Sequence, residues 1–493
     1  MISGNRTFRF ISALLILYLF TILLPVALHW EGLSQFITNF YGEQFELLEL
    51  FGFSATIGLF LWAYIEGRLR RPASWRAWLP IWLTVFLGLF WLSILVETSS
   101  TPGDYPCYQN AAEALLQNKT PYRGCYFYPP LLAQGLAFLS KSIVSFGGLF
   151  GQGVAPDSTW PVVFYLFQSL QLLSILVAFR LSLALAQELK LKKLLSVIFV
   201  SSLFVLNTPL LRTVILHQVN LWILTAVLGI ILLINKKPFW AGVITAFSGH
   251  IKVYPLIFAL PFAVGKKWHA LLGLVAGLAV FVLVPVSLGF RWSIWQQYGQ
   301  FFLRFPQYNA PRNNSLYSIA ANILVLTGAD VTSEGSIWRF APRVGYYLLV
   351  LGVIGWLVWR FLQTRKIIKG VYLFDQKRYL LVEYGFLMDM VAAQLLVSPS
   401  LWEHQWVIIL PFVLWAVSFQ YNLTRRPHIP AAFAGILMIY AVPSFDMIPF
   451  SYVRIAGLLV LLWITNPGLI LEDELPGKWA DRYGQYLFSS IDK

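Results

Sequence analysis

The stretch TPGDYPCYQNAAEALLQNKTPYRGCYFYPPL, residues 101–131, separates two long apolar runs. It is the longest polar interruption in the first third of the chain, and Asp104 lies just after the apolar run at 77–97. The run from Tyr105 to Gln117 has a helical pattern, and the prolines at 121, 129 and 130 then break the chain. The stretch therefore predicts a short helix outside the apolar layer, with one carboxylate at its start.

The composition is that of a membrane protein. Of 493 residues, 58% are hydrophobic and only 12% are charged, about half the charged fraction of a soluble chain. Apolar runs of about 20 residues recur, and each matches the ~30 Å hydrocarbon thickness of a bilayer. We therefore expect an all-α polytopic membrane protein with about 12–14 transmembrane helices. The apolar segments are 8–28, 47–66, 77–97, 160–186, 194–207, 219–235, 238–250, 252–264, 269–289, 341–362, 378–397, 405–422, 429–444 and 452–466.

Lys and Arg residues indicate the orientation. They concentrate in alternate short loops, at 68–76, 190–193, 236–237, 266–267, 365–378 and 425–426. The positive-inside rule puts these loops in the cytoplasm, together with both termini. The net charge of +14 is thus explained by topology, and no nucleic-acid partner is expected. The opposite loops, which include 208–218 and two long ones at 98–159 and 290–340, then face outward. The long loops carry interfacial helices, among them a helix at 131–145 that is too short to span the bilayer. The pattern fits the inner membrane of a bacterium.

The chain has two cysteines, Cys107 and Cys125, and both lie in the opening stretch. In an oxidising compartment they can pair. Two unpaired thiols remain the alternative.

Polar residues concentrate at the outward-facing ends of the apolar segments. Insertion of an ionisable group at membrane depth costs ~2.5–3.5 kcal/mol of free energy, so each such residue needs a structural or functional explanation. Because these positions share one depth, we expect them to line one cavity. They are Asp104, His217, Gln218, Asn220, His250, Lys252, Arg312, Asn313, Asn314, Glu403 and His404.

Each of these residues also has a purely structural interpretation. Asp104 can cap the helix that starts at Tyr105. Lys252 can extend its ammonium to the lipid headgroups, and His404 can be a satisfied interior histidine. Gln218 and Asn220 can join helices by hydrogen bonds, while residues 312–314 can form a turn after a proline.

Several other chemistries lack their motifs. The chain has no phosphate-binding loop of the GxxxxGK[ST] type, no HExxH and no GxSxG. No spacing argues for a tight metal site. A chain of carboxylates through the bilayer would favour a transporter, and Asp389 is the main carboxylate within an apolar segment.

Eight short motifs occur in order between about residue 100 and residue 410. They are Gly103-Asp104, Ala111-Ala112 with Ala114-Leu115-Leu116, Pro121-Tyr122, Tyr128-Pro129-Pro130-Leu131, Gln218-Val219-Asn220, Ile251-Lys252-Val253-Tyr254-Pro255, Asn313-Asn314-Ser315-Leu316, and Ser398-Pro399 with Trp402 and His404. Together they resemble the GT-C superfamily of membrane glycosyltransferases, most closely glycosyltransferase family 87. Two features depart from the family pattern: His217 stands where a glycine is usual, and the first two apolar segments precede the usual start.

The resemblance implies a GT-C catalytic domain at 71–466, preceded by a two-span extension at 1–70 and followed by a cytoplasmic tail at 467–493. It implies an inverting transfer of a hexose, with mannose expected, from a polyprenyl-phosphate donor to a lipid or glycan acceptor outside the cytoplasm. No cofactor or metal is expected. A polyprenyl-phosphate or glycolipid transporter is the alternative.

The resemblance also implies roles for individual residues. Asp104 would be the general base, and His404 would assist the leaving group. The expected substrate-binding and phosphate-binding residues are Lys252, Arg312, Asn313, Gln218, Asn220 and Tyr105.

Overall fold

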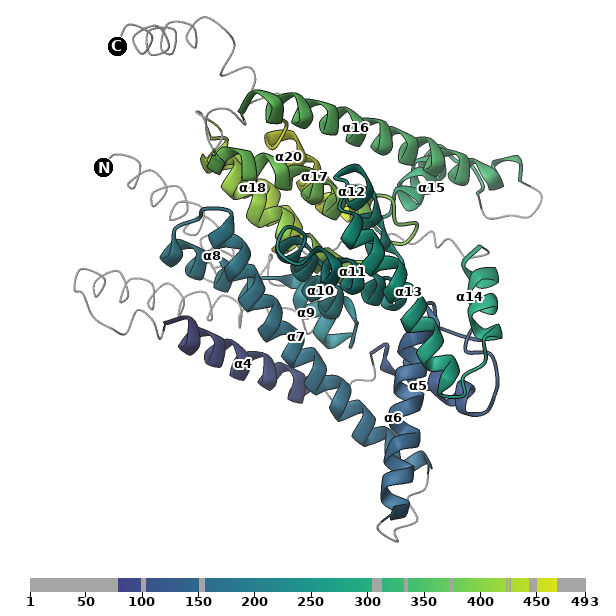
Figure 1. Cartoon of the computed structure of the whole chain (residues 1–493). Coiled ribbons are helices and arrows are strands. Elements are labelled where there is room, and N and C mark those ends of the chain that lie inside the picture. The colour runs from purple at the N-terminus through teal and green to yellow at the C-terminus, as the bar shows by residue number, and fades with distance from the viewer. Residues whose placement is uncertain are drawn as a thin grey trace, which may run out of the picture.

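The computed structural model describes residues 79–98, 103–149, 156–303, 313–331, 336–371, 376–422, 424, 427–442 and 450–467. Within these ranges the chain is helical and forms no strand (Figure 1). The expected all-α membrane fold is therefore confirmed. The extension at 1–70 and nearly all of the tail at 467–493 lie outside the described residues.

The described helices follow the apolar segments closely. The first group is α4 (Leu79–Thr98), α5 (Tyr105–Leu116), α6 (Pro130–Leu149), η2 (Pro156–Thr159), α7 (Trp160–Glu188), α8 (Lys193–Val205), α9 (Thr208–Ile215), α10 (Asn220–Leu233), α11 (Pro238–Ile251), η3 (Tyr254–Phe258) and α12 (Ala259–Val264). The second group is α13 (Trp268–Ser287), α14 (Ser293–Leu303), α15 (Leu316–Leu326), η4 (Ile337–Phe340), α16 (Ala341–Val371), α17 (Gln376–Leu396), η5 (Glu403–Ile409), α18 (Leu410–Asn422), α19 (Ile429–Tyr440), η6 (Phe450–Tyr452) and α20 (Val453–Ile464).

Few of these helices are both long and apolar enough to cross a bilayer unaided. In the part of the chain that the structure describes, three are long and apolar enough: α7, α13 and the helix over Ile337–Ile367. The pair α8 and α9, bent by 48°, makes a fourth if it counts as one span. Others are shorter, such as α10 with 14 residues, because turns and 3-10 segments interrupt them. The expected segments at 8–28 and 47–66 lie outside the described residues.

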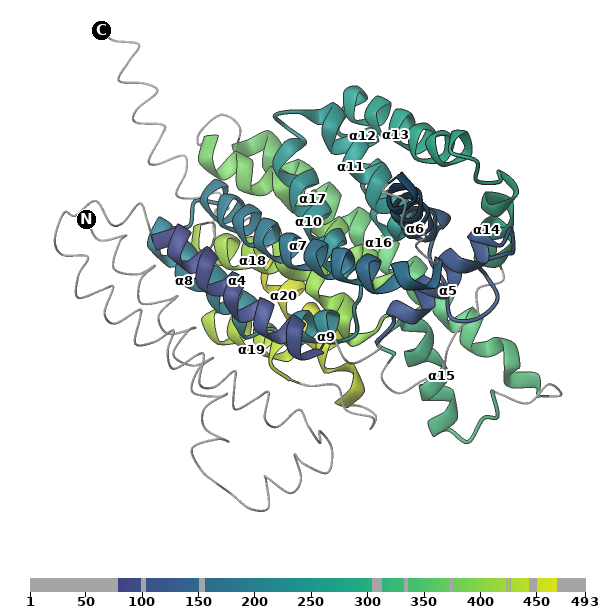
Figure 2. The ribbon, with the colours of Figure 1, turned by 90° about the horizontal axis from the view of Figure 1, so that it is seen from below.

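The outer surface and the interior differ as they do in a protein solvated by lipid. Large apolar side chains are exposed along α13 and α16, among them Leu272, Leu283, Leu348 and Leu351. Contiguous exposed apolar surface marks contact with a membrane or a partner. In contrast, α10 is buried between α7 and α11 and lies in the interior of the helix bundle (Figures 1 and 2).

Two segments differ from the expected loops. Residues 208–218 were expected to be a loop, but they contain α9, which begins after Asn207 because the side chain of that residue accepts the Leu210 N–H at 2.9 Å. Pro209 in the first turn of α9 also suits a helix start. As a result α9 packs against η5.

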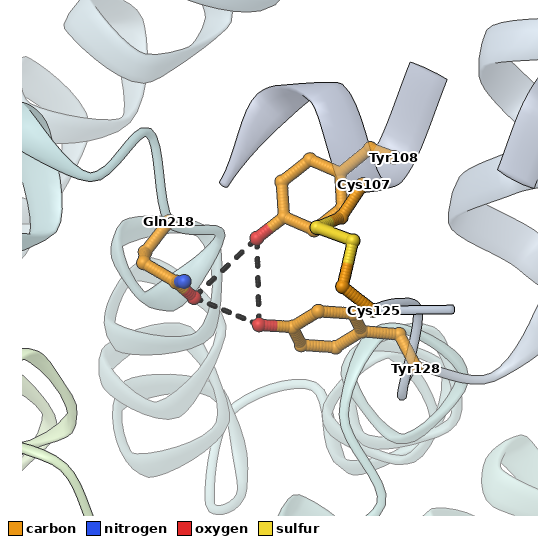
Figure 3. The surroundings of a disulfide bond; sticks show 5 residues. All are labelled: Cys107, Tyr108, Cys125, Tyr128 and Gln218. Carbon is orange, nitrogen blue, oxygen red and sulfur yellow. Dashed lines mark hydrogen bonds between the residues drawn. A yellow bond between two sulfur atoms is a disulfide. The ribbon is translucent and has the colours of Figure 1, made fainter. Parts of the chain in front are cut away.

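The helix expected at 131–145 is longer than expected. As α6 it has 20 residues, and in Figure 1 it projects away from the other helices. It packs against α5. Cys107 on α5 and Cys125, which precedes α6, form a disulfide with their Cα atoms 5.4 Å apart (Figure 3).

Candidate active site

Asp104 lies in a tight turn between α4 and α5. Gly103 adopts φ +47°, a left-handed conformation that favours glycine. A Cβ added at Gly103 would come within 2.8 Å of the His217 ring and within 2.9 Å of the Leu216 carbonyl. The Asp104 N–H donates a hydrogen bond to that same carbonyl oxygen at 2.9 Å. The turn is therefore held directly against the connection between α9 and α10.

The side chain of Asp104 does not cap α5. Its backbone is helical, with φ −96° and ψ −3°, and its carboxylate makes no capping hydrogen bond among the described residues. Burial raises the pKa of Asp104 above its ordinary value of 3.8, and the positive charge of Lys252 opposes that rise. Helix capping therefore does not explain the position of this carboxylate, which interacts electrostatically with Lys252.

Lys252 follows the last residue of α11 and is buried, with 6% of its surface exposed. Its ammonium donates to Oδ1 of Asn220 at 2.7 Å and lies 5.0 Å from the centre of the Tyr128 ring. Burial lowers the pKa of Lys252 to about 7, against an opposing effect of the Asp104 charge. A lysine held by an amide and an aromatic ring in the interior does not extend to lipid headgroups.

His404 joins this group through Asn220. The Nδ2 of Asn220 donates to the His404 carbonyl oxygen at 3.3 Å, and Thr213 Oγ1 donates to the same oxygen at 2.8 Å. Burial lowers the pKa of the His404 imidazole well below its usual 6.5, and the charges of Lys252 and Arg212 lower it further. The imidazole is therefore neutral near pH 7 and has two cations in its surroundings.

Gln218 is hydrogen-bonded to two tyrosine side chains next to the disulfide (Figure 3). Its Oε1 accepts from the hydroxyls of Tyr128 at 2.8 Å and Tyr108 at 3.4 Å. Because Cys107 precedes Tyr108 and Cys125 lies three residues before Tyr128, the disulfide ties together the two segments that carry these rings. Gln218 thus orients Tyr128, the ring that covers Lys252.

Tyr105 and His217 lie next to the turn that carries Asp104. The Tyr105 ring packs against Phe164, with centroids 4.7 Å apart, and its hydroxyl is buried with no hydrogen-bond partner within the described ranges. His217 adopts φ +52°, which explains why glycine is usual at this position. Its Nδ1 lies 3.2 Å from Nε2 of Gln168. The free Tyr105 hydroxyl is the group here that can still bond to a substrate.

Asn313 fastens the second long loop to the segment that carries His404. Its Oδ1 accepts the N–H groups of Leu401 at 2.8 Å and Ser315 at 3.1 Å. The N–H of Asn314 donates to the Leu401 carbonyl oxygen at 2.6 Å. The structure therefore brings Asn313 to the backbone before His404, while Arg312 lies outside the described residues.

The sequence analysis did not select Arg212, Thr213 or Tyr108. Arg212 and Thr213 come from α9, which the hydropathy pattern had assigned to a loop. The available signal was the cation within the apolar run TPLLRTVIL at 208–216. A cation in such a run needs a partner, and here it is Glu403, whose Oε2 lies 3.8 Å from the Arg212 Nε.

Together these residues form a half-buried carboxylate that interacts electrostatically with a buried ammonium, with a neutral imidazole and aromatic rings nearby. Such a set can accept a proton at Asp104 and hold an anion at Lys252. No group of three or more potential metal-ligating side chains occurs in the described part of the chain.

Comparison with protein families gives one match. Residues 126–370, about half of the chain, match the model of glycosyltransferase family 87. This range includes Gln218, Asn220, Lys252 and Asn313, whereas Asp104 and His404 lie outside it. No curated protein and no solved structure matches the chain. By the family match, the chain belongs to glycosyltransferase family 87 and is a glycosyltransferase.

Proposed function

We propose that this protein is an inverting glycosyltransferase that moves a hexose, mannose first among them, from a polyprenyl-phosphate donor to a lipid or glycan acceptor. One observation carries the proposal: the half-buried Asp104 carboxylate does not cap its helix and interacts electrostatically with the buried Lys252. Family membership supplies the reaction class.

In the proposed reaction an acceptor hydroxyl attacks the anomeric carbon of the donor sugar. The hydroxyl proton passes to Asp104, a new C–O bond forms on one face, and the bond to the phosphate oxygen breaks on the other. The raised pKa of Asp104 supports this role, because a general base works best when its pKa approaches the operating pH.

The leaving group in this proposal is a polyprenyl phosphate, whose negative charge grows as the bond breaks. Lys252 supplies an ammonium for that charge, and the His404 imidazole donates a hydrogen bond. The Tyr105 hydroxyl and the amide of Gln218 contact the sugar, while Asn220, whose amide is bonded to Lys252 and to the His404 carbonyl, orients the ammonium. No cofactor enters the scheme, and the site faces the extracytoplasmic side of a bacterial inner membrane.

The intramembrane carboxylate Asp389 supports an enzyme over a transporter. Arg360 donates from Nε to both Asp389 oxygens at 3.0 and 3.1 Å, and its Nη1 donates to the Leu462 carbonyl oxygen at 2.9 Å. A carboxylate held by a buried arginine serves to join α16, α17 and α20. It is poorly suited to take and release a proton in a relay.

A panel of labelled donors tests the proposal. Purified protein in detergent is incubated with polyprenyl-phosphate mannose, polyprenyl-phosphate arabinose and nucleotide sugars, each with total bacterial lipid extract as acceptor. We expect transfer from a polyprenyl-phosphate donor only, with the anomeric configuration inverted in the product by NMR. Transfer from a nucleotide sugar, or retention of configuration, would overturn the proposal.

A further inference from the structure

We infer that Arg212 is a second phosphate-binding cation, which acts with Lys252 near His404 to hold the phosphate of an isoprenoid monophosphate. This inference rests on the proposed function, because it concerns how the donor phosphate is bound. It adds a residue from α9, which contributes none of the expected site residues.

Arg212 is joined to the site through its neighbours. Thr213, the next residue, donates to the His404 carbonyl oxygen at 2.8 Å. Glu403, the residue before His404, lies with its Oε2 3.8 Å from the Arg212 Nε. Two adjacent residues of α9 thus meet two adjacent residues of η5, and this pairing fixes where the guanidinium lies relative to the imidazole.

Glu403 does not fully neutralise the charge of Arg212. Its Oε1 accepts a hydrogen bond of 2.5 Å from Nη2 of Arg454, a fully buried arginine that also donates to the carbonyl oxygens of Ile439 and Val442. The contact to Arg212 is longer than a hydrogen bond. Arg454 is therefore the principal partner of Glu403, and the guanidinium of Arg212 keeps donors for another anion.

The charged groups around His404 have one positive charge in excess, which a bound anion can balance. Arg212 and Arg454 share the carboxylate of Glu403, and Lys252 faces that of Asp104. Among these described groups the cations exceed the carboxylates by one. The Arg212 side chain is 22% exposed, so it can be reached by a ligand. A guanidinium offers a planar fork of donors that matches a phosphate, and a neutral imidazole beside it adds another donor.

The same geometry explains the neutral His404. The charges of both Lys252 and Arg212 act on the imidazole and lower its pKa. An anion between the two cations would relieve that repulsion and let the imidazole N–H donate to it. Two cations and a neutral hydrogen-bond donor are the groups that a monophosphate needs around it.

The test measures binding of farnesyl phosphate, a short isoprenoid monophosphate, to the full-length protein in detergent by tryptophan fluorescence. The uncharged alcohol farnesol is the control ligand. We expect Arg212→Gln to weaken farnesyl phosphate binding about ten- to a hundred-fold, the range for a lost hydrogen bond to a charged group. Farnesol binding should stay the same, and Arg212→Lys should fall between wild type and Arg212→Gln.

Two further comparisons separate binding from stability. Arg343→Gln removes an exposed arginine at the start of α16 and should leave farnesyl phosphate binding unchanged. In transfer assays Arg212→Gln should lower kcat/KM for the donor, because the same guanidinium would also face the charge that grows on the leaving phosphate. Farnesol binding and thermal unfolding that match those of wild type would separate this effect from a loss of the fold around His404.

Each outcome decides one claim. If Arg212→Gln is folded and binds farnesyl phosphate as tightly as wild type, the role of Arg212 is refuted and the proposed function stands. If Arg212→Gln does not fold, Arg212→Lys binding equal to wild type refutes the role in the same way. If wild type binds farnesyl phosphate no better than farnesol, the polyprenyl-phosphate donor itself is wrong.

Discussion

The low pKa of Lys252 makes a sharp prediction about pH. Burial depresses this pKa from 10.5 to about 7, so the ammonium is present below pH 7 and is lost above it. Each pH unit above that point removes the cation from about nine tenths of the remaining molecules. If the cation binds the donor phosphate, kcat/KM for the donor should fall about tenfold between pH 7.5 and pH 8.5.

At acid pH, the dependence of kcat/KM on pH reports the protonation of Asp104. Its pKa is raised by burial, so the carboxylate becomes protonated, and transfer is lost, at a higher pH than for an ordinary aspartate. The expected profile of kcat/KM is a bell. The alkaline limb of kcat should lie at higher pH than that of kcat/KM, because the bound donor phosphate, a diester with one negative charge, favours the charged lysine.

The assay is initial-rate transfer from polyprenyl-phosphate mannose between pH 5 and pH 9, in a buffer series of constant ionic strength. Lys252→Arg, whose side chain stays charged, should flatten the alkaline limb. Lys119→Arg alters an exposed lysine and should leave the profile unchanged. A wild-type kcat/KM that stays constant from pH 7 to pH 9 would refute the reasoning.

Two other perturbations test how the site is held. Gly103→Ala places a methyl group against the Leu216 carbonyl at a left-handed φ. This change should shift Asp104 and lower kcat about a hundred-fold. A kcat near that of wild type would contradict the close contact. Reduction of the disulfide between Cys107 and Cys125, a separation of 18 residues, should lower stability by about 3 kcal/mol. Thermal unfolding with and without a reductant measures this, and the doubly Cys→Ser variant, already destabilised, should show no further response.

The sequence pattern predicted some of the residues that lie together, but not the contacts between them. Asp104, Lys252 and His404 were expected to gather because span parity and the positive-inside rule put them at one depth. Asn220 was expected to touch sugar or to join helices, and the structure adds a specific contact, from its Oδ1 to the Lys252 ammonium. Such pairing depends on the relative rotation of α10 and α11, which hydropathy does not encode.

Other features were beyond the pattern for physical reasons. Hydropathy registers apolar length, so the short buried α9 with Arg212 was expected to be a loop. Asn313 was expected near the sugar because amides bind hydroxyls. The structure adds that its Oδ1 accepts two backbone N–H groups, since a chain that turns inside the protein must satisfy them. The pairing of the two cysteines was left open, because a sequence gives no distance between them.

The most direct test of the account concerns Asp104 itself. Asp104→Asn keeps the size of the side chain and removes the base, and Glu113→Gln removes a second carboxylate of the same segment, on α5, as a matched control. For each purified variant, farnesyl phosphate binding, thermal unfolding and transfer rate are measured side by side. We predict that Asp104→Asn binds and unfolds like wild type and transfers no sugar, while Glu113→Gln retains transfer. A rate near wild type in folded Asp104→Asn would contradict the assignment of Asp104 as the general base.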